Sequence, residues 1–512
     1  MILGIDLGTT NTVVATLDGT GRPVPLPNDL GELITPSVVH FESATAVLVG
    51  TAARAVARLD PDNTVELIKR RMGTECDLLF HGTHHTPESI SALILRGAIG
   101  DRGPVRAVVT VPAYFGIRER EATYQAARLA GIEVLELLSE PVAAALHHGV
   151  VQAPGRGAVL VYDLGGGTFD TTVLRVGEGG VKVVATDGDS ALGGADWDDR
   201  IAEHLVESFA RTTDEVDPYE DEVFLRDAHV LAEEAKRALS DVASRRVVLR
   251  CGAASAAVIL DRPTLESLGS DLVDRTLGIV RRALTAAATK GVHHVDHVVL
   301  VGGSTRMPAI GTAVEARLGV RPRQADPDFA VACGAAIRAH QLADEASRAS
   351  LRKAGGALAA LADKPTSSVV PRSFGVLVED SYDPSGTRRS VVHTVHRNDP
   401  LPARATAFFS TVLDGQDRVR VQVFEQAGEV PSEEVEHNRR VLDGELSGLP
   451  PLPAGSRIEV VLEVDAGGLL SVTAREPVGG ATLRLQGYVD GVLDADGSRR
   501  AASSLAGLSV RQ

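Results

Sequence analysis

A strand, a short acidic glycine-rich turn and a second strand occur twice in this 512-residue chain. The first copy, residues 2–14, turns after Asp6, and the second copy, residues 159–173, turns after Asp163. β-Branched residues favour the strands, and glycine permits a tight turn with close backbone approach. Two such turns facing each other would present backbone N–H groups to both sides of a polyphosphate, with both carboxylates aimed at a hydrated Mg²⁺. The repeat therefore predicts two related lobes around a nucleotide cleft.

The first two thirds of the chain alternate between strand and helix patterns. This alternation over residues 1–341 predicts an α/β nucleotide-binding domain. The second copy of the turn divides the domain into lobe I, through about residue 149, and lobe II, from about 157 to 341. We expect the nucleotide to lie between these two lobes.

The remainder of the chain changes character twice. Residues 342–368 are first rich in alanine and then in turn-forming residues, which indicates a helix and a linker. Residues 369–487 contain short alternating runs separated by hairpin turns, a pattern typical of a small all-β sandwich. Residues 488–512 are rich in Gly, Ser, Ala and Asp, and we expect a disordered tail there.

The composition bears on the class of ligand. The chain has 68 acidic and 52 basic residues and a net charge of −16, whereas nucleic-acid-binding proteins usually carry a basic excess. Its cysteines, Cys76, Cys251 and Cys333, lack metal-ligand spacing and suggest free thiols in a reducing compartment. The first strand begins at Ile2, and no apolar run approaches the roughly 18 residues that span a bilayer. We expect a cytoplasmic protein that binds neither nucleic acid nor membrane.

Six motifs, in order, resemble those of the DnaK-type seventy-kilodalton heat-shock chaperones of the actin-like ATPase superfamily. They occupy residues 4–11, 111–115, 140–146, 161–170, 192–198 and 300–308. A Walker-type P-loop is not present in the sequence. The resemblance covers nearly all of residues 1–341 and, more loosely, the chain through about Gly487. It implies a two-lobed actin-like (ribonuclease H-like) ATPase domain followed by a peptide-binding β-sandwich.

The resemblance also implies an ATP site with Mg²⁺, and with K⁺ as a candidate second cation. Asp6 and Asp163 would hold Mg²⁺ through water, and Lys69 would position the attacking water. The residues implied in hydrolysis are Lys69, Glu140, Thr168 and Asp170. The residues implied in nucleotide binding are Gly8, Thr9, Thr10, Asn11, Gly165, Gly166, Gly167, Thr168, Gly194, Glu233, Lys236, Arg237, Ser240, Gly302, Gly303, Ser304, Arg306 and Asp328. Slow turnover is expected, because positioning and charge stabilisation carry this kind of hydrolysis.

The same resemblance extends to the sandwich and to communication between the domains. Val376, Phe409 and Val419 are candidates for a pocket that takes an aliphatic side chain of an extended peptide. Their alternative interpretation is ordinary sandwich core. Pro112 and Arg120 match a proline and an arginine that the family uses as an interdomain relay.

The chain departs from the family in several places. Members normally continue into a helical lid, whereas this chain stops soon after Tyr488, so we expect faster peptide exchange. The linker region 364–371 keeps only two aliphatic residues. Glu136 stands where bacterial relatives carry an arginine that meets the J-domain co-chaperone, and the segment 73–90 is short. These departures leave J-domain and exchange-factor contacts open.

Two functions therefore compete at this point. The leading one is an ATP-dependent molecular chaperone that binds extended hydrophobic polypeptide clients. The alternative is a nucleotide-gated interaction or regulatory module with one dedicated protein partner, which the altered linker and Glu136 favour. A small-molecule kinase of the wider superfamily is disfavoured, because a sandwich has no place in a sugar kinase.

Overall fold

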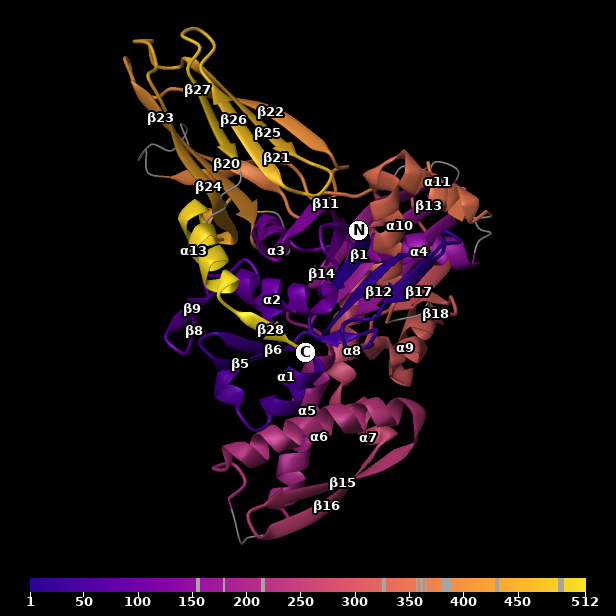
Figure 1. Cartoon of the computed structure of the whole chain (residues 1–512). Helices are drawn as coiled ribbons and strands as arrows, with labels where there is room; N and C mark the ends of the chain where they lie inside the picture. The colour runs from indigo at the N-terminus through magenta and orange to yellow at the C-terminus, as the bar shows by residue number, and fades with distance from the viewer. Residues whose placement is uncertain are drawn as a thin grey trace.

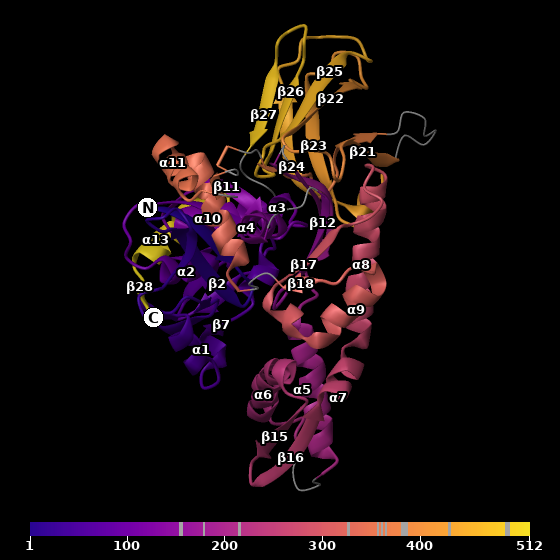
Figure 2. The same ribbon diagram turned by 90° about the vertical axis from the view of Figure 1, so that its right-hand side faces the viewer.

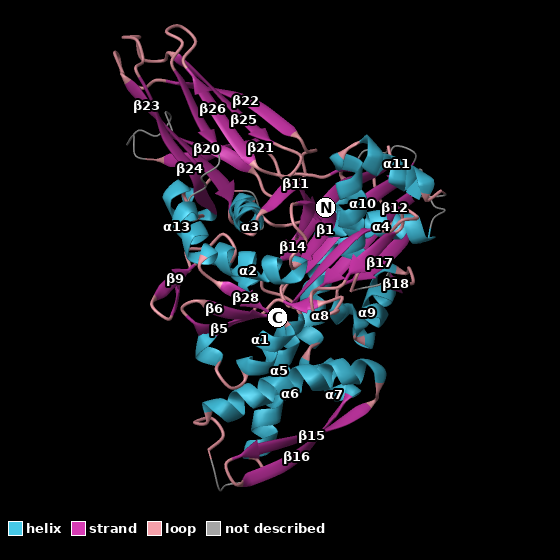
Figure 3. Cartoon of the chain, in the orientation of Figure 1, coloured by secondary structure: helices cyan, strands magenta, loops and turns pink. Residues whose placement is uncertain are grey.

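A computed structural model describes residues 1–152, 157–177, 180–212, 217–324, 328–355, 358–359, 362–363, 366–379, 388–428, 432–486 and 492–512. Two α/β lobes lie side by side, and a β-sandwich lies against one end of them (Figures 1 and 2). The predicted α/β class with a following all-β sandwich is confirmed (Figure 3). Lys364 and Pro365 of the expected linker, and the start of the expected tail, lie outside the described residues.

The central sheets of the two lobes share one topology. In each sheet, three consecutive strands pair antiparallel. The first of these three strands also pairs with a parallel strand on its other side, and a second parallel strand follows at the edge. The lobe I sheet consists of β1 (Ile2–Leu7), β2 (Asn11–Leu17), β3 (Pro23–Leu26), β4 (Thr35–Pro36), β10 (Val105–Val111) and β11 (Ile132–Ser139). The lobe II sheet consists of β12 (Gly157–Leu164), β13 (Phe169–Gly177), β14 (Gly180–Asp189), β17 (His297–Val301), β18 (Arg323–Gln324) and β19 (Thr366–Ser367). The repeated turns are therefore the β1–β2 and β12–β13 connections.

Helices and small sheets surround these cores. Lobe I carries α1 (Thr51–Ala57), α2 (Pro87–Ile99), α3 (Ile117–Leu129) and α4 (Glu140–Gln152), with β5 (Val39–Ser43), β6 (Ala46–Val49), β7 (Thr64–Val65), β8 (Leu78–Phe80) and β9 (Thr83–His85). Lobe II carries α5 (Gly194–Ala210), α6 (Glu222–Asp241), α7 (Arg262–Leu268), α8 (Ser270–Ala288) and α9 (Pro308–Leu318), with β15 (Ser244–Cys251) and β16 (Ala254–Asp261). Short 3₁₀ turns occur at Pro61–Asn63, Ile68–Arg71, Gly303–Arg306 and Val435–His437. Within the described part of the chain, no helix combines the length and apolar character needed to cross a membrane.

The helix that follows lobe II in sequence lies on lobe I. This helix, α10 (Ala330–Ala343), approaches β1 so closely that a Cβ on Gly4 would lie 2.0 Å from the backbone nitrogen of Ala336. A Cβ on Gly334 would likewise lie 1.8 Å from the carbonyl oxygen of Ala143 in α4. The expected extent of lobe II, 157–341, is therefore wrong at its end, because small residues let α10 pack onto the other lobe. It continues into α11 (Glu345–Lys353).

The sandwich is made of two four-stranded antiparallel sheets. One contains β20 (Phe374–Glu379), β21 (Arg389–Val395), β23 (Arg418–Gln426) and β24 (Asn438–Ser447), and the other β22 (Ala403–Ser410), β25 (Arg457–Val464), β26 (Leu470–Arg475) and β27 (Thr482–Gln486). The linker strand β19 pairs with β14 of lobe II. The two aliphatic linker residues are both buried, Val369 in a core of the ATPase lobes and Val370 in the sandwich core.

The C-terminal segment is folded where we expected a disordered tail. Helix α13 (Ala495–Ala506) is capped by Asp494, and β28 (Ser509–Arg511) pairs in parallel with β6 of lobe I. Leu505 is fully buried in the lobe I core. The expectation of disorder for 488–512 is thus wrong for the described residues 492–512, because their few apolar side chains pack on a lobe I surface that local composition does not reveal.

We expect Leu505→Ala to lower the free energy of unfolding of lobe I by about 2–5 kcal/mol, the usual cost of truncating a buried leucine. Ser503→Ala, on the exposed side of the same helix, is the matched control and should change it by less than about 0.5 kcal/mol. Urea unfolding measures both. Equal midpoints for the two variants would contradict the placement of Leu505.

Candidate functional site

The two repeated turns touch each other across the lobes. Gly8, Thr9, Thr10 and Asn11 lie at the first turn, and Gly165, Gly166, Gly167 and Thr168 at the second. A Cβ on Gly166 would lie 2.4 Å from Cγ2 of Thr10, and one on Gly167 would lie 2.4 Å from Cγ2 of Thr9. Any side chain at these two glycines would push the lobes apart. The predicted phosphate-binding residues are therefore brought together.

Two further loops are fastened to the second turn by hydrogen bonds. The N–H of Gly194 donates to the carbonyl of Gly165 at 2.9 Å, and that of Ala195 to the carbonyl of Gly166 at 2.7 Å. The Ser304 hydroxyl also donates to the Gly165 carbonyl, at 2.9 Å. A Cβ on Gly302 would lie 2.4 Å from the carbonyl oxygen of Leu164. The loops at 194 and 302–304 thus form one wall with the second turn.

A buried ion pair joins Lys69 to Glu140. Lys69 Nζ is 2.6 Å from Oε1 of Glu140, and both side chains are almost fully buried. Burial alone would lower the pKa of Lys69, but the charges of Glu140 and Asp6 raise it above its usual value. Lys69 follows Leu67, whose φ of 54° is rare for a leucine. The ammonium is therefore charged and held in a strained turn, a combination frequent at functional sites.

Three carboxylates crowd around this ion pair. Burial and the charge of Glu140 raise the pKa of Asp6 to about 6 and those of Asp163 and Asp170 well above their usual range. Thr110 donates to Asp6 at 2.9 Å. Oδ2 of Asp170 is buried and has no hydrogen-bond partner among the described residues. Crowded carboxylates with an unsatisfied oxygen fit a cation, since a nearby positive charge would favour their ionised forms.

The carboxylates do not by themselves form a direct metal cage. Among the described residues, no group of three or more His, Cys, Asp or Glu side chains is arranged to hold a metal ion. The residues present therefore fit a Mg²⁺ whose coordination is completed by water and phosphate oxygens, which is the usual mode of magnesium binding to nucleotides.

Three of the predicted nucleotide-binding residues of lobe II lie together. Lys236 donates to the carbonyl of Gly194 at 2.6 Å and to Asp198 at 2.7 Å, and a Cβ on Gly194 would lie 2.3 Å from the Ser304 hydroxyl. Burial raises the pKa of Asp198 to about 6 although Lys236 opposes the shift. Gly194, Lys236 and Ser304 are thus adjacent.

The other predicted residues are already paired, and Glu233 also lies 3.8 Å from Arg54 of lobe I. Arg306 contacts Asp328 at 2.5 Å, and Glu233 contacts Arg237 at 2.6 Å. The Ser240 hydroxyl donates to a backbone carbonyl of its own helix. Gly303 has open space where a Cβ would stand.

Ionic contacts across the cleft were not predicted from the sequence. Arg70 of lobe I donates to the carbonyl of Gly167 at 2.9 Å and to Asp196 at 2.8 Å. Arg58, the residue that follows α1, pairs with Asp227 of α6 at 2.6 Å. Because Arg70 is next to Lys69 in the segment that matches the family, the sequence could have suggested that Arg70 lies at the site. Its partner Asp196 could not be predicted, because a pair separated by 126 residues leaves no local sequence pattern.

The sandwich docks on the start of α3 in lobe I. Glu425, fully buried, accepts a hydrogen bond from the backbone N–H of Ile117 at 2.8 Å, and Arg439 joins Glu425 to Glu119 at 2.8 and 2.9 Å. The sandwich thus supplies the capping carboxylate of a lobe I helix whose own cap residue is glycine. Sequence analysis missed Glu425, because nothing in a strand pattern marks an interdomain cap.

The predicted relay residues lie at the same interface. Arg120 is buried and donates to the carbonyl of Phe115 at 2.9 Å and to that of Gly467 in the sandwich at 2.8 Å. Burial lowers the pKa of Arg120 to about 10. The Pro112 carbonyl accepts from the Phe115 N–H at 3.2 Å, and the Tyr114 N–H lies 3.4 Å from Asp170. The turn at residues 112–115 therefore contacts both Asp170 and Arg120, the arginine that bonds to the sandwich.

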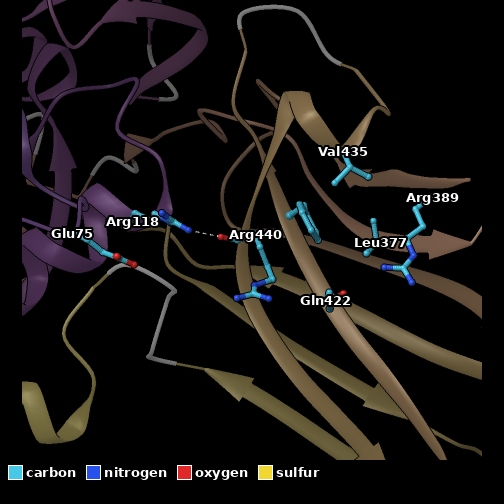
Figure 4. A pocket seen from close by; sticks show the side chains of 8 residues that line it. Glu75, Arg118, Leu377, Arg389, Gln422, Val435 and Arg440 are labelled. Atoms are coloured by element: carbon cyan, nitrogen blue, oxygen red, sulfur yellow. Dashed lines mark hydrogen bonds between the residues drawn. The ribbon is translucent and has the colours of Figure 1, made fainter.

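A cavity of about 510 Å³ remains beside these contacts (Figure 4). Arg118 of lobe I spans it by donating to the carbonyl of Arg440 at 2.6 Å. Its other lining residues are Glu75, Leu377, Arg389, Gln422, Phe424 and Val435. Its charged lining residues are three arginines, Arg118, Arg389 and Arg440, and one glutamate, Glu75, so the lining is net positive. The cavity is lined by residues of the β20–β21–β23–β24 sheet and by Glu75 and Arg118 of lobe I.

A second docking contact involves lobe II. Arg397 of the sandwich pairs with Asp187 at 2.8 Å, and the side chain of Asn398 accepts from the N–H of Thr186 at 3.1 Å.

Glu136, the residue expected to repel a J-domain, pairs instead with Arg338 of α10 at 2.8 Å. Its negative charge is therefore largely compensated within the chain.

The predicted peptide-pocket residues differ in burial. Val376 lies inside the sandwich core, whereas Phe409 and Val419 are partly buried against it. Val412 and Leu413, just beyond β22, are 60% and 65% exposed. Phe409 and Val419 thus keep part of their side chains accessible, whereas Val376 lies in the ordinary core.

The contact between the turns leads to a prediction. Gly167→Ala would press a methyl group against Thr9 and Arg70, and overpacking of this kind typically costs 1–3 kcal/mol, so we expect roughly 10- to 100-fold weaker ATP binding by calorimetry. Gly177→Ala, where a Cβ meets open space, is the control. Wild-type affinity in Gly167→Ala would show that the turns are not held this close.

Comparison with known proteins gives a consistent result. The profile of the family described as "Hsp70 protein" matches residues 2–496. The chain is 37% identical over 491 residues to the "Chaperone protein DnaK" of Thermotoga petrophila, which covers 93% of this chain and 78% of that protein. The protein of the same name from Thermotoga neapolitana gives the same identity and coverage. With the duplicated lobes, the facing turns and the sandwich, these matches show that the chain belongs to the Hsp70 family.

Proposed function

We propose that this protein is an ATP-dependent molecular chaperone that hydrolyses ATP slowly to ADP and phosphate and binds extended hydrophobic polypeptide through its sandwich. The observation that carries the proposal is the buried Lys69–Glu140 ion pair, which lies among three carboxylates at the contact of the two turns. The name of the Thermotoga relatives, and the family match, support the chaperone part.

In this proposal the chain's residues act mainly by position. Backbone N–H groups of the two turns and the hydroxyls of Thr9, Thr10 and Thr168 hold the phosphates. Asp6 and Asp163 hold Mg²⁺ through water, and Asp170 holds a water or a second cation such as K⁺. When bound, Mg²⁺ neutralises charge on the phosphates.

The ion pair gives Lys69 its role. Glu140 fixes the ammonium in one place, and the ammonium orients the attacking water toward the terminal phosphate. Because Lys69 stays charged, it acts as a fixed hydrogen-bond donor and not as a base. The remaining predicted residues, Gly194, Glu233, Lys236, Arg237, Ser240, Gly302, Gly303, Ser304, Arg306 and Asp328, would hold the adenosine.

Removing the ammonium tests this assignment. We expect Lys69→Ala to slow single-turnover ATP hydrolysis on the order of 100-fold or more, as does loss of one transition-state donor in other enzymes. Lys182→Ala, an exposed lysine of β14, is the control, and chelation of Mg²⁺ should abolish hydrolysis in both. Hydrolysis by Lys69→Ala at the wild-type rate would exclude this role for Lys69.

A second prediction separates peptide pocket from sandwich core. If Val419 contacts the peptide, Val419→Ala should weaken binding of a fluorescent hydrophobic heptapeptide about tenfold, since one or two lost methyl contacts are worth about 1–2 kcal/mol. Val478→Ala, 75% exposed in the same domain, is the control. Unchanged affinity together with a lower melting temperature would assign Val419 to the core.

The nucleotide-gated module with one dedicated partner is the competing proposal, and the names of the Thermotoga relatives do not favour it. Single-turnover ATP hydrolysis with and without hydrophobic peptide distinguishes the two proposals, because only the hydrolysis rate of a general chaperone should be stimulated by the peptide.

The chaperone proposal includes a cytoplasmic location and polypeptide clients. The rate of ATP hydrolysis with an added J-domain protein tests whether Glu136, whose charge is compensated by Arg338, still prevents contact with the J-domain.

A further inference from the structure

The C-terminal segment, residues 492–512, connects the sandwich back to lobe I. We propose that this segment is an intramolecular tether that keeps the sandwich docked on lobe I whether ATP or ADP is bound. The nucleotide states named here rest on the proposed ATPase function. The family profile ends at residue 496, so Leu505 and β28 lie beyond the part of the chain that matches the family.

The last residues are built into lobe I as a strand. Ser509, Val510 and Arg511 of β28 pair with Ala46, Val47 and Leu48 of β6, and they extend the sheet β7–β5–β6 by one strand. This is strand addition, in which main-chain hydrogen bonds provide the affinity. The Gln512 side chain also bonds the carbonyl of Gly97 and accepts from the N–H of Asp29.

The preceding helix is anchored to two helices of lobe I. Gln125 of α3 donates to the carbonyl of Leu493 at 3.0 Å, and Arg96 of α2 donates to the carbonyl of Leu505 at 3.0 Å. Figure 1 shows α13 beside α3 and below the sandwich. Helix α3 thus contacts α13 and receives, at its N-terminus, the cap from the sandwich residue Glu425. The tether and the docking contact share one helix.

Apolar packing is continuous from lobe I into the sandwich. Ile117 of α3 is 1% exposed and belongs to the sandwich core. Leu469 of the sandwich and Val492 of the tether each pack against both the lobe I core and the sandwich core. Domains joined by polar contacts usually move relative to each other, whereas a shared apolar core opposes this motion. Separation would expose these side chains to water.

Chain length limits any separation. The sandwich ends with β27 at Gln486, and the tether is anchored from Val492, so the connection can span at most about 22 Å at 3.3–3.6 Å per residue. On its other side the sandwich is held by the linker strand β19, which pairs with β14 of lobe II. The sandwich is thus attached to the ATPase lobes at both of its ends. Release of β28 and Leu505 is required for free movement.

Distances between spin labels test the tether. Labels at Asp101→Cys in lobe I and Val478→Cys in the sandwich, both exposed, are introduced with Cys76→Ser, since Cys251 and Cys333 are buried. In the full chain we expect one narrow distance distribution that is the same without nucleotide, with ATP and with ADP. A broader and longer distribution with ADP in the full chain would overturn the proposal.

Variants of the tether complete the test. Val510→Asp puts a charge on the partly buried strand residue and should broaden the distribution with ADP, as should a chain ending at residue 491. Ser509→Asp, at the exposed neighbouring position, should not. Circular dichroism checks that each variant is folded. If the chain that ends at residue 491 does not fold, the Val510→Asp variant alone provides the test. A distribution as narrow in a folded Val510→Asp variant as in the full chain would overturn the proposal.

The outcome is independent of catalysis. Hydrolysis is measured on the same labelled proteins, and its absence would overturn the proposed ATPase function. The comparison between full and altered chains without nucleotide would still show whether the tether restrains the sandwich: variants as narrow as the full chain contradict it, and broadened variants support it.

Discussion

The contact between bare backbone at the two repeated turns is the constraint on which the rest of the structure depends. Gly166 and Gly167 meet Thr10 and Thr9 at distances that leave no room for a Cβ. Each turn must therefore be held rigidly, and each is the hairpin of a sheet with parallel strands added beside it. The return of α10 from lobe II onto β1 ties the two sheets into one body. The duplicated topology is what makes a narrow cleft with polar backbone on both sides attainable.

The charges in this cleft are costly for the folded state. Asp6, Asp163 and Asp170 have raised pKa values because burial and neighbouring carboxylates disfavour their ionised forms, so they weaken stability at neutral pH. For Asp6, the loss of folding stability is absent at pH values below its ordinary pKa of 3.8, and it is complete at pH values above its raised pKa of about 6. The positive charge of Lys69 offsets part of this cost at Asp6 and Asp163. A cation bound beside these carboxylates would favour their ionised forms and so relieve this cost.

Local patterns predicted the site better than they predicted how the domains associate. The turns around Asp6 and Asp163, and the α/β and all-β halves, follow from glycine placement and strand periodicity. The return of α10, the cap supplied by Glu425 and the folding of the tail around Leu505 do not, because each depends on a partner surface hundreds of residues away. Composition alone suggested disorder for a segment whose few apolar residues happen to fit lobe I.

The start of α3 is where docking and chemistry meet. The helix has glycine at its cap position, so its first N–H groups depend on Glu425 from the sandwich. The turn just before it carries Tyr114, whose N–H approaches Asp170 in the cleft, and Arg120 joins Phe115 of this turn to the sandwich. If the sandwich left, a buried carboxylate and a buried guanidinium would lose partners, each at a cost of a few kcal/mol. Residues 114–117 therefore connect the contact at Asp170 with the cap from the sandwich, and Ile117 packs in the sandwich core, so that undocking would expose this side chain to water.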